Sequence, residues 1–192
     1  MGRVIVLQAG ADEDSDPRAA QALLERLPYA RRLELDRRDA QSRRASLLAI
    51  DLVLRGASGL LGREVSVGEL RFPQGGKPWC CDGPFFSVSH TARRVAVALS
   101  VDCELGIDLE DVPSGAGPGG DALARLERWT ATEAALKAAG LGLRDVQRVE
   151  LDAGCATATC QGATYFLRPL RLGPDVVASL ATAAPPESVV VY

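Results

Sequence analysis

Residues 85–110 read FFSVSHTARRVAVALSVDCELGIDLE, and this stretch decides the fold class. It contains three runs rich in Val, Leu, Ile and Phe, at 85–90, 95–101 and 105–110, separated by short charged segments. Short apolar runs divided by turn residues are typical of neighbouring antiparallel strands. A further run at 65–72 precedes them. We therefore expect a small antiparallel sheet in the middle of the chain.

The segment before this stretch carries one strand signal and two helix signals. Residues 3–8 are apolar and β-like, and an acidic turn follows at 12–16. Pro17 then opens a helix, because proline is favoured at the first helical position. A second helix is expected at 39–54, where the side chains are so apolar that it must face the core over most of its circumference.

The segment after this stretch predicts a loop, a long helix and several strands. The Gly- and Pro-rich residues 111–120 are unsuited to regular structure. Asp121 is a candidate N-cap for a helix that Gly140 closes. The remaining β-like runs predict a meander of strands at 149–151, 156–160, 164–170, 176–183 and 189–191. Together these signals predict an α+β fold.

Composition excludes several classes of protein. The 192 residues carry a formal net charge of -3, which disfavours a nucleic-acid binder because such proteins need a clustered basic surface. The apolar run near the N-terminus is too short for a signal peptide or a membrane span, so we expect a cytoplasmic protein with no membrane partner. The 5 cysteines have no CxxC spacing and a single histidine accompanies them, so reduced thiols are favoured over structural zinc.

Two acidic residues alternate with apolar ones in the last of the three runs. In Leu-Gly-Ile-Asp-Leu-Glu at 105–110, strand geometry places Ile107 and Leu109 on one face and Asp108 and Glu110 on the other. The two carboxylates are then about 6.6 Å apart along the strand, close enough to share one hard cation. The competing interpretation is an edge strand with two solvent-facing acids.

A third acid lies in the predicted helix at 121–139. At about 100° per residue, Glu133 falls inside the apolar stripe formed by Leu126, Trp129 and Leu136. A carboxylate in such a stripe requires a metal ion or a cation beside it. Lys137, four residues on, is one such cation, although an ordinary surface Glu–Lys pair explains both residues equally well.

Candidate phosphate-binding residues are scattered through the first half. Lys77 lies in a Gly-Gly-Lys-Pro turn, and Ser89 and His90 end the first of the three runs. Ser89 and His90 point to opposite faces of a strand, which disfavours a nucleophile and base pair. A local basic cluster suits phosphate, but a salt-bridged helix face explains it as well; its members are Arg31, Arg32, Arg37, Arg38, Arg43 and Arg44.

The order of these motifs resembles the surfactin-type 4'-phosphopantetheinyl transferases. The motifs are Gly-Lys-Pro at 76–78, Phe-Ser-Val-Ser-His at 86–90, Gly-Ile-Asp-Leu-Glu at 106–110, and Trp-Thr-Ala-Thr-Glu-Ala-Ala-Leu-Lys-Ala at 129–138. The resemblance implies a pseudo-twofold monomer of two similar halves, 1–102 and 103–192, each a small antiparallel sheet packed with a helix. It places the active site between the halves.

The resemblance also implies an activity and a role for each motif. The enzyme would transfer the 4'-phosphopantetheine group of coenzyme A to a serine of an acyl or peptidyl carrier protein. The family's Mg²⁺ ligands correspond to Asp108, Glu110 and Glu133. Glu133 also resembles the family's general base. Lys137 resembles the residue that neutralises the departing adenosine 3',5'-bisphosphate. The family's phosphate contacts correspond to Lys77, Ser89, His90, Arg43 and Arg44.

Two departures from the family pattern keep other functions open. Thr132 stands where the family usually has lysine, and residues 111–120 replace a longer segment. A non-catalytic binder of coenzyme A or of a carrier protein is therefore an alternative. A magnesium-dependent phosphohydrolase acting on small phosphates is another, because it explains the acids and Lys77 without any carrier.

Overall fold

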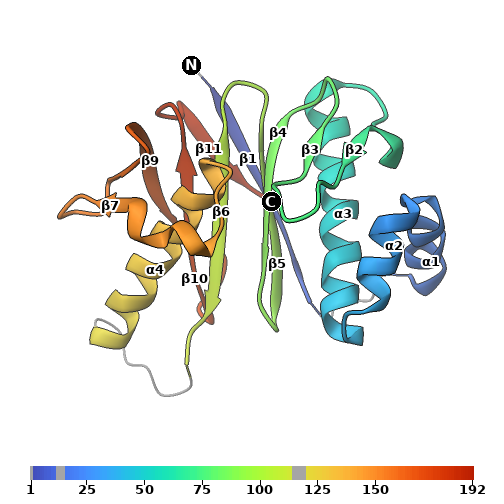
Figure 1. The fold of residues 1–192 in the computed structure, drawn as a ribbon, viewed down its shortest axis with the longest axis horizontal. Coiled ribbons are helices and arrows are strands. Elements are labelled where there is room, and N and C mark those ends of the chain that lie inside the picture. The colour runs from blue at the N-terminus through green and yellow to red at the C-terminus, as the bar shows by residue number, and fades with distance from the viewer. Residues whose placement is uncertain (1, 12–15, 114–119) are drawn as a thin grey trace.

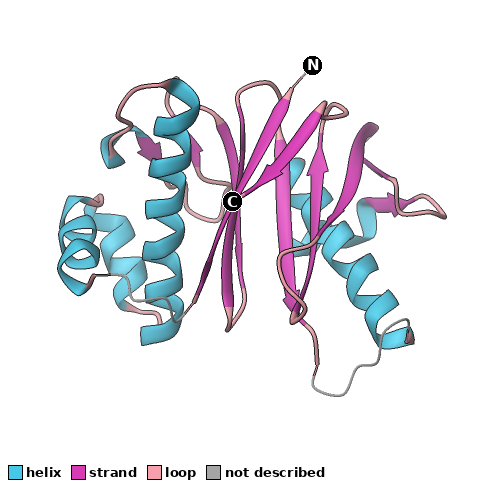
Figure 2. Cartoon of the chain, turned by 180° about the vertical axis from the view of Figure 1, so that it is seen from behind, coloured by secondary structure: helices cyan, strands magenta, loops and turns pink. Residues whose placement is uncertain are grey.

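The computed structural model describes residues 2–11, 16–113 and 120–192 and has a mixed α+β fold (Figures 1 and 2). Its helices are α1 (Pro17–Arg26), α2 (Tyr29–Asp36), α3 (Ala40–Leu61) and α4 (Asp121–Ala138), with 3-10 turns at Val67–Glu69 and Leu143–Arg148. Its strands are β1 (Arg3–Gly10), β2 (Leu70–Arg71), β3 (Trp79–Cys80), β4 (Phe85–His90), β5 (Arg94–Ser100), β6 (Leu105–Asp111), β7 (Val149–Leu151), β8 (Thr157–Cys160), β9 (Ala163–Leu170), β10 (Val176–Thr182) and β11 (Ser188–Val191).

Two sheets form the middle of the molecule, and the helices cover their outer faces (Figure 2). The first sheet has the order β11-β1-β5-β4, and α3 lies against it. The second has the order β6-β10-β9-β8-β7, and α4 packs on it. A short β2-β3 pair accompanies the first sheet. The layers therefore follow the order helix, sheet, sheet, helix.

Three apolar cores hold these layers together. One lies between α3 and the first sheet and includes Val53 and Phe86. The central core joins the two sheets through residues such as Val6 of β1 and Ile107 of β6. The third lies between α4 and the second sheet and consists largely of alanines and other small side chains. Because β6 contributes to the central core and also lies under α4, both of its faces are covered.

The first helices differ from the sequence prediction in extent and number. Helix α3 begins where expected, with Asp39 capping the amide of Ser42, but it continues to Leu61 and ends at Gly62, whose φ is 63°. Gly56 allows the continued helix to pack closely on the first sheet, because a Cβ atom at this position would lie only 2.7 Å from a methyl carbon of Leu99. The short helix α2 was not expected. The predicted strand at 65–72 is wrong for its first part, which forms a 3-10 turn.

Two expectations about the second half are also corrected. Gly120 rather than Asp121 is the N-cap residue of α4, and Asp121 lies in the first turn. The run at 189–191 does not continue the meander of the second sheet. It belongs to β11, which pairs in parallel with β1 of the first sheet, so that sheet is mixed rather than purely antiparallel. The predicted acidic turn at 12–15 and the loop core at 114–119 lie outside the described residues.

Two further sequence expectations bear on the chemistry of the chain. The five cysteines are free thiols, but we expected most of them to be buried, and only Cys80 and Cys160 are; Cys81, Cys103 and Cys155 are half-buried. In the described part of the chain, no helix combines the length and the apolar character that a bilayer crossing requires.

Candidate metal and phosphate site

Strand β6 places Asp108 in the interior rather than on the surface. Its side chain lies on the same face as Gly106, toward α4, while Ile107 and Leu109 enter the central core. Asp108 is 3% exposed, and Glu110, two residues on, is half-buried near the end of the strand. β6 is an edge strand of its sheet, but the interpretation that both acids face solvent is wrong, because Asp108 is buried and Glu110 is only partly exposed.

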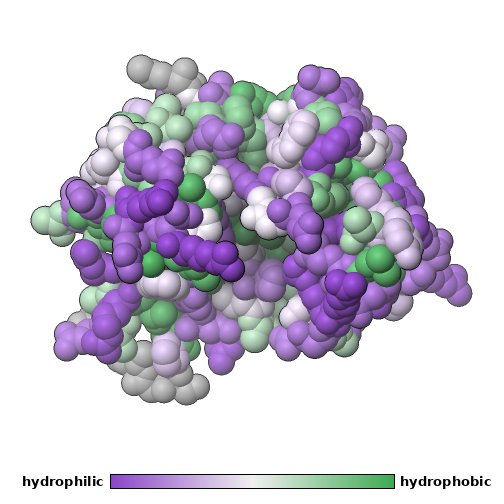
Figure 3. Space-filling model, viewed as in Figure 1, coloured by the Kyte–Doolittle hydropathy of each residue, from purple (hydrophilic) through white to green (hydrophobic). Residues whose placement is uncertain are grey.

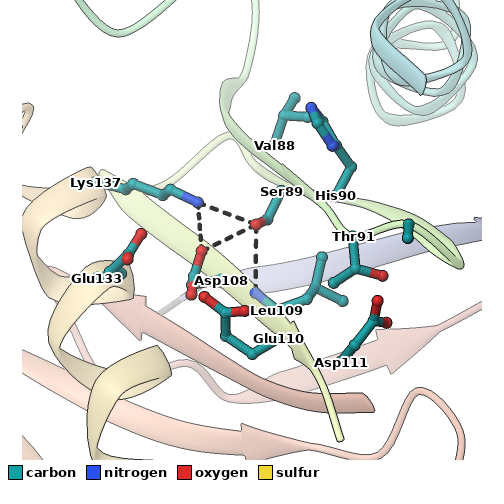
Figure 4. A pocket seen from close by; sticks show the side chains of 11 residues that line it. Val88, Ser89, His90, Thr91, Asp108, Leu109, Glu110, Asp111, Glu133 and Lys137 are labelled. Atoms are coloured by element: carbon teal, nitrogen blue, oxygen red, sulfur yellow. Dashed lines mark hydrogen bonds and ion pairs between the residues drawn. The ribbon is translucent and has the colours of Figure 1, made fainter. Parts of the chain in front are cut away.

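Helix α4 lies almost in contact with the backbone of β6. A Cβ atom added at Gly106 would lie 2.0 Å from the carbonyl oxygen of Ala134 and 2.5 Å from the amide nitrogen of Ala138. Only small side chains fit where the helix meets the strand at Gly106, and Ala134 and Ala138 are buried there. This approach brings the side chains of the next helical positions, Glu133 and Lys137, above Asp108 (Figure 4).

Trp129 does not occupy the core position that the helical stripe predicted. Its side chain is 39% exposed, and its indole Nε1 donates a hydrogen bond to Glu110 Oε1 at 3.2 Å. The indole therefore fixes the orientation of Glu110 at the edge of the site. Glu133 is half-buried, as its place in the stripe predicted, but the surroundings are acidic rather than apolar.

Three carboxylates converge at this point. Asp108, Glu110 and Glu133 each offer one oxygen, and these oxygens all lie within 4.8 Å of one another. Lys137 Nζ lies 2.6 Å from Asp108 Oδ1, and the Ser89 hydroxyl donates to the same oxygen at 2.9 Å. The other oxygen of Asp108, Oδ2, is buried and has no hydrogen-bond partner among the described residues.

Mutual repulsion and burial change the acidity of these groups. Burial, and then the charge of Asp108, raise the pKa of Glu133 from 4.5 to about 7. The same two causes raise the pKa of Glu110. The site therefore holds more negative charge than its single lysine balances. Carboxylate oxygens at this spacing, one of them without a donor, suit a hard divalent cation such as Mg²⁺ or Mn²⁺.

The acids line a cavity of about 420 Å³ that opens at the ends of β4 and β6. A second cavity, of about 340 Å³, adjoins it and shares Val88, His90 and Lys137 with it. Figure 3 shows the face of the molecule on which a hollow separates the half that carries α3 from the half that carries α4. The first cavity contains the acids, and the second contains most of the cations.

The predicted phosphate contacts fall into two groups. Ser89, His90 and Lys77 line the cavities, although Lys77 Nζ is bound to Glu104 at 2.6 Å and to the carbonyl oxygen of Leu105. Arg43 and Arg44 line neither cavity; Arg43 forms an ion pair with Asp36 at 3.1 Å, and Arg44 is exposed.

Two other members of the basic cluster do reach a cavity. Arg31 and Arg38 line the second cavity, where both pair with Glu34 and Arg38 also donates to Ser46 Oγ at 2.9 Å. Arg31 lies on α2, a helix that the sequence pattern did not predict, so the direction of its side chain was not predictable either. If residues 29–36 had been predicted as a helix, Arg31 and Leu35 would have been expected on the same face, one turn apart.

His90 lies between the two cavities in a positive environment. Its ring reaches solvent but is partly enclosed, and desolvation followed by the charges of Arg38 and Lys137 lowers its pKa below 6.5. At neutral pH the imidazole is therefore uncharged and able to donate one hydrogen bond from a ring nitrogen. An anion in the cavity would favour the charged form.

The raised pKa of Glu133 predicts how stability depends on pH and metal. The folded protein takes up a proton on this group more readily than the unfolded chain, so stability falls as pH rises from 4.5 to 7. Mg²⁺ favours the ionised form, and we expect it to raise Tm by several degrees at pH 8 and much less at pH 5.5.

Thermal unfolding of the wild type and of Glu133→Gln checks this expectation. Without metal, the variant should gain stability relative to the wild type as pH rises from 5.5 to 8, and Mg²⁺ should stabilise it little. An equal Mg²⁺ effect on both proteins at pH 8 would argue against a metal site at the three carboxylates.

No protein-family model matches the chain, and no curated protein sequence matches it at a significant level.

Proposed function

We propose that this protein is a 4'-phosphopantetheinyl transferase that moves the phosphopantetheine arm of coenzyme A to a serine of an acyl or peptidyl carrier protein. The observation that carries the proposal is the cluster of Asp108, Glu110 and Glu133, with the unpartnered oxygen of Asp108, beside a cavity lined with cations. An acidic cluster next to a basic cavity suits a metal-bound diphosphate. The order of the sequence motifs supports the same activity.

The three carboxylates would hold Mg²⁺ in this proposal. When bound, the ion would neutralise the diphosphate of coenzyme A and polarise the phosphorus that is attacked. Asp108 is fixed for this role by Ser89 and Lys137, and Glu110 by the indole of Trp129.

The residues around the acids supply the proton transfer and the charge balance. The hydroxyl oxygen of the carrier serine attacks the β-phosphorus, and the bond from that phosphorus to the oxygen of adenosine 3',5'-bisphosphate breaks. Glu133, which Mg²⁺ would keep ionised, would accept the proton of the serine hydroxyl. Lys137 stabilises the negative charge that develops on the departing bisphosphate. In this proposal the base and the cation lie one turn apart on one helix.

The second cavity is proposed to bind the adenosine 3'-phosphate end of coenzyme A. Arg31 and Arg38 provide guanidinium groups at its wall, and Phe72 and Leu70 provide apolar surface. Arg31 lies over the ring of Phe72, with its guanidinium carbon 5.0 Å from the ring centroid. Cations suit the phosphate, and the apolar wall suits the adenine base.

Arg38→Ala is expected to raise KM for coenzyme A by about ten- to a hundredfold, since a charge-assisted hydrogen bond contributes about 1.5–3 kcal/mol. The kcat should change little, because Arg38 lies away from the three acids. Steady-state kinetics with varied coenzyme A measures both constants. Arg43→Ala is the matched control and should leave KM within about twofold of the wild type, because Arg43 pairs with Asp36 outside the cavity.

Incubation with Mg²⁺, coenzyme A and a panel of apo carrier proteins tests the activity, with the intact mass of each carrier as the readout. The proposal expects the carrier to gain the mass of phosphopantetheine, and the gain to disappear with EDTA and in Glu133→Gln. Magnesium-dependent binding of coenzyme A without any gain would indicate a non-catalytic binder. Release of phosphate from generic phosphate esters would indicate a phosphohydrolase.

A further inference from the structure

The edges of the two sheets meet along β4 and β6 without forming a ladder. Within the described residues, β4 pairs with β5 only and β6 pairs with β10 only, so neither strand has a strand partner there on its second edge. The two strands nevertheless run in close contact. Outward-facing amide groups of β6 at this junction need acceptors, because a buried amide without one is costly.

Two serines of β4 supply these acceptors. Alternation along the strand directs Phe86 and Val88 toward the core under α3, and Ser87 and Ser89 toward β6. The amide of Ile107 donates to Ser87 Oγ at 3.1 Å, and the amide of Leu109 donates to Ser89 Oγ at 3.3 Å. Both serines are buried, with 5% and 7% of their surface exposed. The serine hydroxyls thus replace a missing strand pairing.

Asp108 lies between the two amides that the serines hold. The backbone on one side of it is fixed by Ser87 and on the other side by Ser89, while α4 presses on β6 at Gly106 from a third direction. Ser89 also contacts the carboxylate of Asp108 directly, whereas Ser87 contacts only the backbone. A shift of this segment would therefore move Asp108 away from Glu133 and Lys137.

We infer that Ser87 is a positioning residue for the metal site: its hydroxyl holds the backbone of β6 so that Asp108 meets Glu110 and Glu133 at a distance suited to one divalent cation. This inference rests on the metal site of the proposed function but not on the transfer reaction. Ser87 touches none of the three carboxylates, so it acts through the peptide of Ile107. Groups that orient metal ligands from behind typically change metal affinity by about 10–100-fold when removed.

Substitutions that keep or remove the hydroxyl at constant shape test this role. Thr and Val have nearly the same shape, but only Thr offers an acceptor to the amide of Ile107. The readout is Mn²⁺ binding to the whole protein, followed by the loss of the free-ion electron paramagnetic resonance signal. We expect Ser87→Val to bind Mn²⁺ about tenfold more weakly than Ser87→Thr. Ser87→Ala should behave like Ser87→Val.

A matched control separates positioning from stability. Ser100 is also buried in the first sheet and its hydroxyl makes two hydrogen bonds with the backbone, but these lie at the far end of β5, at Arg3 and Asp102. Ser100→Ala should lower the unfolding temperature and leave Mn²⁺ affinity unchanged. Equal Mn²⁺ affinity in the Thr and Val variants would overturn the inference and leave the proposed function intact. If the wild type showed no Mn²⁺ binding that the Glu133→Gln substitution weakens, both this inference and the proposed function would be overturned.

Discussion

Replacing Glu133 with Gln is expected to lower kcat for phosphopantetheine transfer by about 10²–10⁴-fold, the range that loss of a general base usually costs. The amide keeps the size of the side chain but cannot accept the proton of the carrier serine, and it removes one of the three clustered carboxylates. The rate should be measured at saturating coenzyme A and carrier protein, over a range of Mg²⁺ concentrations.

Glu127→Gln is the matched control for this prediction, because Glu127 lies on the same helix but on its exposed surface. Its kcat should equal that of the wild type. If Glu133→Gln loses activity at low Mg²⁺ but recovers fully at high Mg²⁺, Glu133 serves as a ligand and not as the base. Full activity at every Mg²⁺ concentration would contradict both roles.

Gly106→Ala is expected to destabilise the protein by at least about 1–3 kcal/mol, the usual cost of overfilling a packed interior. The added Cβ atom would overlap the carbonyl oxygen of Ala134 and the amide nitrogen of Ala138. These are backbone atoms of α4, so the clash cannot be relieved by rotating a side chain. The helix must move away from β6, and Glu133 and Lys137 move with it.

Urea unfolding and Mg²⁺ binding check this prediction together. The midpoint of unfolding should fall, and the folded fraction of the variant should bind Mg²⁺ more weakly than the wild type. Gly59→Ala offers a comparison, since a Cβ atom at that helical position meets nothing within 4 Å and alanine favours helix. That variant should be as stable as the wild type or slightly more so. An unchanged midpoint in Gly106→Ala would contradict the prediction, because it would show that the added methyl group fits between β6 and α4.

The alternation in residues 105–110 predicted that Asp108 and Glu110 share a face, and the structure has this arrangement. The sequence did not predict that the same face is buried, because the helix that covers it comes from residues 121–138 and depends on Gly106 for its approach. The same contact explains the error over Trp129. A helix this close to a strand buries its small residues, and its largest side chain turns toward the rim.

The placement of the arginines depended on a helix that carried too weak a signal. Half of residues 29–36 are charged, and their helix follows Pro28 without a side-chain cap. Without that element, the cluster had no predictable direction, and nothing in the sequence indicated that Arg31 and Arg38, rather than Arg43 and Arg44, line a cavity. Local patterns therefore predicted which residue types form the site. Contacts between distant segments decided which individual residues reach it.

The pairing of β11 with β1 has a consequence for how the chain folds. β1 has β5 on one side and β11 on the other, so its neighbours come from residues 94–100 and 188–191. Such long-range pairing makes folding slow, because large loops must close before the contacts stabilise them. During synthesis the first sheet acquires its edge strand only after the second sheet has been made. Residues from near both ends of the chain are therefore needed to complete the sheet that carries Ser89 and His90 on β4.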